Sequence, residues 1–146
     1  MKSSQLVTAL STNQETKAVF LGVYASDQLP VSIKNNAALV VNTHPSCMPG
    51  QHWCAFYITS ECVYYFDSYG QPPFVKSFMT LMRCRKKQKI FGRRVQGSGP
   101  MCGHYCLYFL LAMARGDLSC MDKFGHHLNA NDRLVRKEVL RHFRIP

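Results

Sequence analysis

The chain has 146 residues, of which 47% are hydrophobic, and it carries a formal net charge of +10. This length suits a single domain, residues 1–146, and the apolar content excludes a disordered polypeptide. The longest apolar run, residues 106–114, is far shorter than the ~20 residues that a membrane helix needs, and we see no secretion signal. The seven cysteines are therefore expected to be free thiols in a reducing compartment, the cytosol or the nucleus.

The first part of the chain predicts one helix followed by strands. A helix is expected near residues 4–10, with Ser3 or Ser4 as its cap. Residues 17–25 read as a strand, and the short apolar run at residues 37–43 is typical of a strand buried on both faces. A loop with two prolines follows at residues 44–51.

The middle of the chain predicts a β-hairpin. Residues 52–58 and 63–70 are rich in aromatic and β-branched side chains, and the sequence TSEC separates them. If Ser60 and Glu61 form a two-residue turn, the numbers of paired residues add up to 121. His52 and Asp67 then lie on the same face of the sheet as diagonal neighbours, close enough for a carboxylate to meet an imidazole. A three-residue turn would instead place Asp67 on the opposite face.

The last part of the chain predicts three helices. Residues 72–87 have apolar side chains at helical spacing, with Pro73 suited to the first turn. Residues 102–115 are apolar all round, which indicates a buried helix, ended by Gly116. Residues 129–143 predict an amphipathic helix capped by Asn131 or Asp132, with an apolar face that includes Leu140. Strands in the middle and helices mainly at the two ends favour an α+β fold, a small mixed sheet packed by the central buried helix.

A histidine facing a carboxylate is half of a nucleophilic triad, because the carboxylate fixes the imidazole tautomer and stabilises its charged form. Cys102 is the best candidate for the third member, since it lies where a loop enters the buried helix. A thiol at a helix N-terminus beside a protonated histidine has a lowered pKa. Gly99 and Pro100 allow a sharp entry into the helix, and Gly103 lets a substrate backbone approach.

Acyl transfer also needs donors for an oxyanion. The backbone N–H of Cys102 is one candidate, because it lies at the helix start. The side-chain amide of Gln96, six residues earlier, is the second. Taken singly, each of these residues has an ordinary structural interpretation; Asp67, for example, could simply form a turn. The ordered set of His52, Asp67, Gln96 and Cys102, each at the end of a predicted element, favours catalysis.

Three segments resemble the active-site blocks of the adenovirus-type cysteine protease (adenain) and of the related proteases specific for ubiquitin-like modifiers. They are GQHWCAFYI, VYYFDSYG and QGSGPMCGHYCLYFLL. The family order of His-Trp, an acid, Gln and Cys-Gly matches His52-Trp53, Asp67, Gln96 and Cys102-Gly103. The resemblance covers about residues 50–112 and, less closely, residues 19–43, where it implies that Asp27 lies near the substrate groove. It implies that Trp53 and Gly103 contact the substrate as well.

The resemblance implies a papain-like core in permuted order and a viral maturation endopeptidase that cuts capsid or core precursors at glycine-containing sites. The adenovirus enzyme has Glu where this chain has Asp67, and the FDSYG form is closer to versions from virus-like DNA transposons and related viruses. The chain is also shorter than the adenovirus enzyme, so some family helices must be trimmed. We expect a monomer that needs no metal or other cofactor, located in the host nucleus or cytoplasm and in the virion, without membrane contact.

A dense basic run precedes the oxyanion loop and would attract DNA. Its members are Arg83, Arg85, Lys86, Lys87, Lys89, Arg93 and Arg94. The alternative is a solvated basic face without a partner. Cys84 lies inside this run, and the resemblance implies that a cysteine here forms a disulfide with an activating viral peptide, with DNA as a second activator. The alternative for Cys84 is a surface thiol without a partner.

Two other functions remain open from the sequence. A deconjugating protease for a ubiquitin-like modifier would use the same triad, but it needs a wide binding surface for which 146 residues leave little room. An inactive, basic nucleic-acid-binding virion protein on a protease fold would have no need of an intact set of four site residues. The sequence therefore predicts a cysteine endopeptidase.

Overall fold

The computed structural model describes the whole chain, residues 1–146. Its elements in chain order are α1 (Ser3–Thr12), β1 (Phe20–Tyr24), β2 (Ala37–Asn42), β3 (Trp53–Ile58), β4 (Cys62–Phe66), α2 (Lys76–Met82), β5 (Lys87–Phe91), α3 (Cys102–Ala114), the short 3₁₀ helix η1 (Cys120–Lys123) and α4 (Leu128–His142). The fold is therefore α+β, as predicted. None of the helices has both the length and the apolar character needed to cross a bilayer.

The strands form one mixed sheet in the order β1-β2-β3-β4-β5. The outer pairs β1–β2 and β4–β5 are parallel, and the two inner pairs are antiparallel. Within the hairpin, Ala55 pairs with Phe66 and Ile58 with Val63, so the paired numbers add up to 121 and the predicted register is confirmed. In this register His52, just before β3, and Asp67, just after β4, lie close together at the open end of the hairpin.

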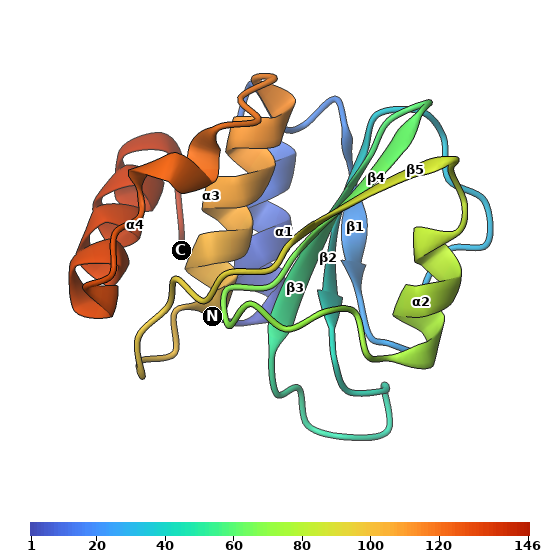
Figure 1. Cartoon of the computed structure of the whole chain (residues 1–146), viewed down its shortest axis with the longest axis horizontal. Coiled ribbons are helices and arrows are strands. Elements are labelled where there is room, and N and C mark those ends of the chain that lie inside the picture. The colour runs from blue at the N-terminus through green and yellow to red at the C-terminus, as the bar shows by residue number, and fades with distance from the viewer.

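Helices cover both faces of the sheet. Figure 1 shows α1 and α3 on one face, with α4 outside α3, and α2 on the other face. All six residues of β2 are buried, as expected for a strand covered on both sides. Ala38 and Val40 contribute to the core beneath α1 and α3, whereas Leu39 and Val41 contribute to the core beneath α2.

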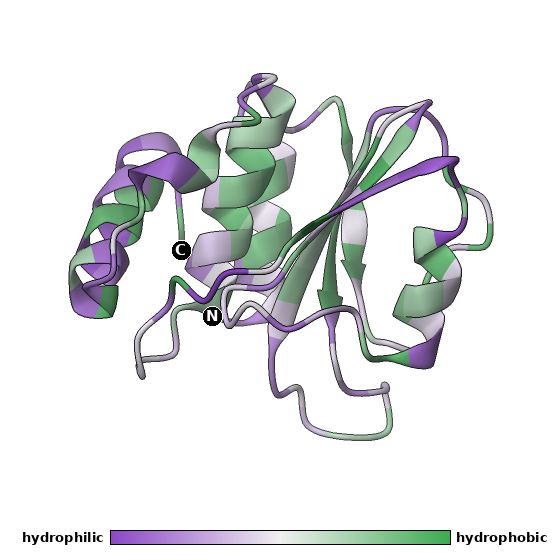
Figure 2. Ribbon diagram, in the orientation of Figure 1, coloured by the Kyte–Doolittle hydropathy of each residue, from purple (hydrophilic) through white to green (hydrophobic).

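Helix α3 forms the centre of the larger core. Ten of its thirteen residues are buried, as predicted for a helix that is apolar all round. Gly116 follows the helix with a φ of +74°, a left-handed conformation that ends it at the predicted place. The hydropathy colouring in Figure 2 shows the contrast with α4 and β5, which carry long hydrophilic stretches. The three residues of α3 that are not buried are Cys102, His104 and Ala114, and Cys102 is the one at the start of the helix.

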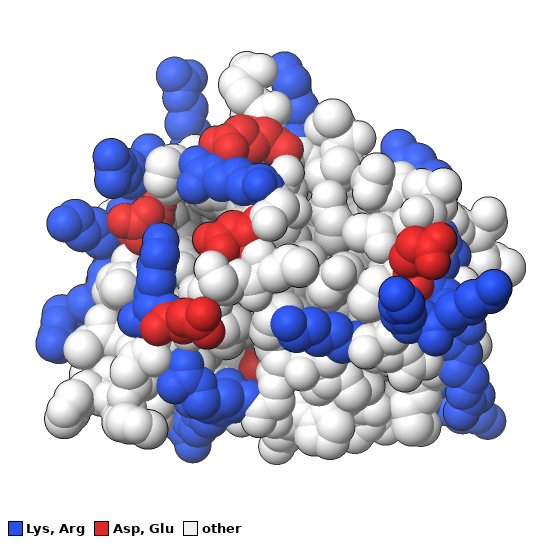
Figure 3. All heavy atoms as spheres, turned by 45° about the horizontal axis from the view of Figure 1, so that its top comes forward, with Lys and Arg blue, Asp and Glu red and all other residues white.

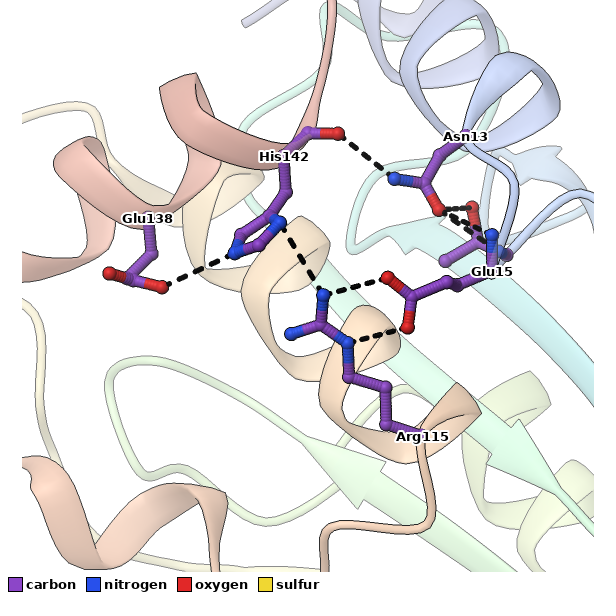
Figure 4. A network of polar contacts seen from close by, with 6 residues as sticks. Asn13, Glu15, Arg115, Glu138 and His142 are labelled. Carbon is purple, nitrogen blue, oxygen red and sulfur yellow. Dashed lines mark hydrogen bonds and ion pairs between the residues drawn. The ribbon is translucent and has the colours of Figure 1, made fainter.

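A polar network joins the ends of α1, α3 and α4 (Figure 4). The guanidinium of Arg115 binds both carboxylate oxygens of Glu15, at 2.6 and 2.7 Å. The ring of His142 lies beside Arg115, and the His142 carbonyl accepts a hydrogen bond of 2.9 Å from the Asn13 amide. The bidentate pair therefore links the end of α3 to the segment after α1, and His142 connects α4 to both.

Several local predictions were wrong. Helix α2 begins at Lys76, so Pro73 is not in its first turn, and Phe74 lies before the helix with 56% of its surface exposed. Helix α4 begins at Leu128, so Asn131 does not cap it, and Leu140 on its outer side is 66% exposed.

Two further predictions of helix caps were wrong. Asp132 is also inside α4 rather than at its cap, and its carboxylate accepts hydrogen bonds from Gly97 and Tyr105. The residue that precedes α1 is Lys2, not Ser3 or Ser4. The basic run was not expected to contain a strand, yet part of it forms β5, an edge strand of the sheet.

Candidate active site

Four residues that the sequence singled out meet at one end of the sheet. His52 immediately precedes β3, Asp67 immediately follows β4, Cys102 is the first residue of α3, and Gln96 lies between β5 and α3. His52, Gln96 and Cys102 line one hollow of the surface. Asp67 lies fully buried behind His52. The structure therefore brings together all four residues of the expected constellation.

The imidazole of His52 is held by Asp67. Nε2 of His52 lies 2.7 Å from Oδ1 of Asp67, and only 11% of the His52 side chain is exposed. The same carboxylate oxygen accepts a hydrogen bond of 2.8 Å from the backbone N–H of Tyr69. Because Nε2 is occupied in this way, Nδ1 is the ring atom left to serve the thiol.

Electrostatics favour an ion pair between Cys102 and His52. Burial acts to lower the pKa of His52, but the interactions with Asp67, Cys102 and Cys54 outweigh it and raise the pKa to about 12. Burial acts to raise the pKa of Cys102, but the interaction with His52 and the backbone amides of Trp53 and Gly103 lower it below its ordinary value. A thiolate beside an imidazolium is the reactive form of a catalytic cysteine.

Gln96 is fully buried, and its side-chain amide is oriented by three contacts. Its Oε1 accepts a hydrogen bond of 2.6 Å from the Ser68 hydroxyl. Its Nε2 donates to the Gly99 carbonyl at 2.6 Å and to the Tyr69 hydroxyl at 3.3 Å. Both amide protons therefore have partners, and an oxyanion would have to replace the longer contact, the one to Tyr69.

Ser68 and Tyr69 organise the site, although the sequence reasoning assigned a role to neither. The Tyr69 ring stacks on His52 with centroids 4.8 Å apart, and the guanidinium of Arg94 lies 5.1 Å above the same ring. The backbone carbonyl of Ser68 accepts hydrogen bonds from Val95 and Gln96. The predicted hairpin register did place Tyr69 opposite His52, but the only signal for Ser68 was its position directly after Asp67 in FDSYG, a segment that reads as a simple turn.

Three connected hollows form a groove across Cys102. The first, of about 630 Å³, contains His52, Tyr69, Phe74 and Gln96. The second, of about 530 Å³, contains Lys2 and Trp53. Both are lined by Gln51, Pro100 and Cys102, so they meet at the thiol. The third, of about 340 Å³, continues the second past Trp53 toward Met48. An extended chain can therefore cross the thiol with residues on both sides of it.

The three residues expected to contact substrate differ in their positions. Trp53 lines the groove, and its indole N–H donates a hydrogen bond of 3.0 Å to the Met1 carbonyl. Gly103 is covered by Met1, because a Cβ built on Gly103 would lie 2.9 Å from the Met1 Cβ. Asp27 is exposed and accepts two hydrogen bonds from Ser46, at 2.7 and 2.6 Å, so it holds the loop that precedes β3. Its contact with substrate stays a prediction.

The basic run divides into engaged and free cations. Arg85 donates to the carbonyls of Thr59 and Ile33, Arg93 to those of Met121 and Phe124, and Arg94 to those of Gln96 and Gly97. Lys89 lies over the Phe91 ring at 5.1 Å. Arg83, Lys86 and Lys87 are exposed and make none of these contacts. In Figure 3, Lys and Arg side chains gather at the two ends of the visible face, over α4 and where β5 begins.

The remaining cysteines are free thiols. Cys84 is exposed, and desolvation raises its pKa although Arg85 opposes this effect. Cys54 lies deep beside the site, and its sulfur, a nitrogen of His52 and an oxygen of Asp67 lie within 4.8 Å of one another. Such a set could ligate a soft metal ion, but burial raises the pKa of Cys54, and a neutral thiol is a poor ligand. His52 and Asp67 of this set are already paired at 2.7 Å, an arrangement that suits acid–base work.

Comparison with solved structures shows a likeness to the pS273R protease of ASFV. The TM-score is 0.54, with 24% sequence identity, and the match covers 79% of this chain and 46% of that protein. The chain has a protease-like fold. It spans less than half the length of the ASFV protease. Comparisons of the sequence with protein-family models and with curated proteins find no match.

Proposed function

We propose that the chain is a cysteine endopeptidase. Cys102 is the nucleophile, His52 acts as base and then as acid, Asp67 orients His52, and Gln96 acts with the Cys102 backbone N–H as oxyanion donor. The observation that carries this proposal is the His52–Asp67 contact of 2.7 Å beside a thiol of lowered pKa, in a groove open on both sides of that thiol. The protease-like fold supports the same conclusion.

In the acylation step, the Cys102 thiolate attacks the carbonyl carbon of the scissile peptide bond. The negative charge that develops on the carbonyl oxygen is stabilised by the N–H of Cys102 at the start of α3 and by Nε2 of Gln96. The intermediate collapses as the C–N bond breaks. The imidazolium of His52 gives its proton to the departing amine, and the acyl group remains on sulfur as a thioester.

In the deacylation step, neutral His52 takes a proton from water, and the resulting hydroxide attacks the thioester carbonyl. The second oxyanion uses the same two donors, and the thiolate leaves. Asp67 stabilises the imidazolium throughout without moving, because its Oδ1 is fixed by the Tyr69 N–H as well as by His52. The protein's residues therefore return to their starting ionisation after each turnover.

We further propose that the natural role is maturation of viral precursor proteins at glycine-containing sites, on a papain-like core in permuted order. The support is the resemblance of residues 50–112 to the adenovirus-type active-site blocks, together with the likeness in fold to the ASFV protease. Glycine near the cut suits the passage over Cys102, which runs between Gln51 and Pro100. DNA and a peptide joined to Cys84 are proposed activators on the basis of that resemblance and of the exposed cations near β5.

The test of the enzymatic proposal is turnover of internally quenched peptides that contain glycine before the cut. We expect cleavage by the wild type and none by Cys102→Ala, because the thiolate is the attacking atom. Cys47→Ala is the matched control, since Cys47 is an exposed free thiol outside the groove, and it should cleave at the wild-type rate. Cleavage by Cys102→Ala at the wild-type rate would refute the assignment.

A further inference from the structure

The proposed chemistry gives the groove a direction. The general acid must lie beside the nitrogen of the departing amine, because it gives that nitrogen a proton as the C–N bond breaks. His52 lines the hollow that also contains Tyr69 and Phe74, and it does not line the hollow on the other side of Cys102. The departing half of the substrate therefore lies on the Tyr69–Phe74 side, and the acyl half lies on the Trp53 side. We call these two sides of the groove the leaving arm and the acyl arm.

Apart from the charged Cys102–His52 pair, the leaving arm is lined by neutral side chains. The polar ones include Thr43, Gln51, Gln71, Gln96 and Ser98. This neutrality is notable in a chain with a net charge of +10. The acyl arm differs, because Lys2 lines it. Substrate residues in the leaving arm therefore meet a surface that selects by shape and apolar contact rather than by charge.

Phe74 is the large apolar side chain of the leaving arm. Its side chain is 56% exposed, although the segment that carries it is firmly held. Gly70, four residues earlier, packs against the backbone of Arg93 and Arg94, where an added Cβ would lie 2.5 Å from the Arg94 nitrogen. Two prolines then lead directly to Phe74. The ring is thus presented to the groove at little cost in conformational entropy, and a substrate side chain can cover it.

We infer that Phe74 is a specificity-determining residue, which selects an uncharged, apolar side chain within the first three substrate residues after the cut. This inference rests on the proposed endopeptidase activity and adds to it the class of residue on the leaving side. The glycine preference proposed for the acyl side is a separate matter, since it concerns the passage between Gln51 and Pro100.

The test uses quenched peptides that share one acyl segment cleaved by the wild type and differ only after the cut. Leu, Ala, Glu and Lys are placed in turn at each of the first three positions. We expect Leu to exceed Ala in kcat/KM by roughly 10-fold at one of them, with Glu and Lys no better than Ala, since an apolar pocket discriminates by about this much. Phe74→Ala should bring the Leu to Ala ratio close to one, because the Leu side chain loses its apolar contact. Leu140→Ala, which removes an exposed apolar side chain outside the groove, should keep the wild-type ratio.

A second measurement tests the direction of the groove. A peptide aldehyde that ends at the cut carries only the acyl segment, so its inhibition constant should be the same for wild type and Phe74→Ala. Weaker inhibition of Phe74→Ala would show that Phe74 contacts the acyl half and would overturn the inference. Cleavage by the wild type without any Leu preference would overturn it as well, with the endopeptidase proposal intact. If no peptide is cleaved and the aldehyde does not bind Cys102, both proposals fall together.

Discussion

At the scale of single residues, the reactivity of the site depends on the partnership of Cys102 with His52. Against the effect of burial, the hydrogen bond to Asp67 and then the one to Cys102 raise the pKa of His52 to about 12. Burial acts to raise the pKa of Cys102, but the hydrogen bond to His52 helps to lower it, so the charged pair exists at every pH between the two values. Cys106, one helical turn further along α3, is fully buried, and burial raises its pKa well above the ordinary value. Two thiols on one helix thus differ in reactivity because only one lies beside the imidazole.

This difference predicts the pH dependence of alkylation. A group with a lowered pKa stays ionised below its ordinary pKa, and it loses the charge only as the pH falls through the lowered value. Cys102 should therefore react with iodoacetamide at pH 6, where an ordinary thiol with a pKa near 8.5 is almost wholly protonated. Peptide mapping by mass spectrometry should show Cys102 modified well before the exposed thiol of Cys47.

His52→Ala supplies the control for the alkylation experiment. Without the imidazole, burial is the largest remaining influence on Cys102, and it raises the pKa. Labelling of Cys102 at pH 6 should then fall to the level of Cys47 or below, while labelling above pH 9 recovers. Equal rates for Cys102 and Cys47 in the wild type at pH 6 would contradict the ion pair.

At the scale of elements, helix α4 holds the loop that carries Gln96. The carboxylate of Asp132 accepts a hydrogen bond of 3.1 Å from the Gly97 N–H and one of 2.8 Å from the Tyr105 hydroxyl. Asn131 donates to the Val95 carbonyl at 3.1 Å. These contacts begin one residue from Gln96 on either side, so the position of its amide depends on the placement of α4.

Asp132→Ala tests this dependence. The Gly97 N–H loses its acceptor, which should lower the free energy of unfolding by about 1–3 kcal/mol, the cost of leaving a half-buried donor unpaired. Loosening of the loop should lower kcat while KM changes little, since the oxyanion contact strengthens in the transition state. The upper limit for this loss is given by Gln96→Ala, which removes the donor itself and should lower kcat by about 10²–10³-fold. Arg133→Ala, the exposed neighbour, is the control. An unchanged kcat in Asp132→Ala would show that α4 does not position the Gln96 amide.

The elements also show what the sequence could predict. The hairpin register followed from a two-residue turn and the strict alternation of strand side chains, so the meeting of His52 with Asp67 could be foreseen. Strand β5 could not, because its lysines suit the exposed edge of a sheet and carry no apolar alternation. The start of α4 was missed because Asn131 and Asp132 resemble capping residues in the sequence. In the structure their side chains instead contact Gly125, Val95 and Gly97.

At the scale of the whole molecule, part of the positive charge is used inside the fold. Arg85, Arg93 and Arg94 bind backbone carbonyls and thereby fix the segments on both sides of β5. A polyanion cannot take over these three guanidinium groups without loss of internal contacts. The free cations near β5 are fewer than the sequence suggested, and a second set lies on α4. Its members are Arg133, Lys137 and Arg141, whereas Arg136 on the same helix contacts the Met101 sulfur.

The two sets of free cations make the proposed DNA activation testable by comparison of two variants. One variant replaces Arg83, Lys86 and Lys87 with Ala, beside β5, and the other replaces Arg133, Lys137 and Arg141 with Ala, on α4. Neither set touches the groove, so DNA-free peptide turnover should equal that of the wild type for both. Arg85 is left in place because its replacement would remove the hydrogen bonds to the Thr59 and Ile33 carbonyls that hold the segment before β5.

If DNA activates through the chain from β5 to Gln96, only the variant beside β5 should lose the gain in turnover. Affinity for duplex DNA should fall with salt, and each contact removed should reduce the log–log salt slope by about 0.9, with little dependence on DNA sequence. The gain in turnover should vanish over the same salt range as binding, measured with wild type and both variants at low and moderate salt. Loss of activation in the α4 variant alone would move the DNA site to the helix that holds Gly97 and would make α4 the element that transmits the effect. Binding without any change in turnover would leave the charge a role in packaging or localisation and would end the activation proposal.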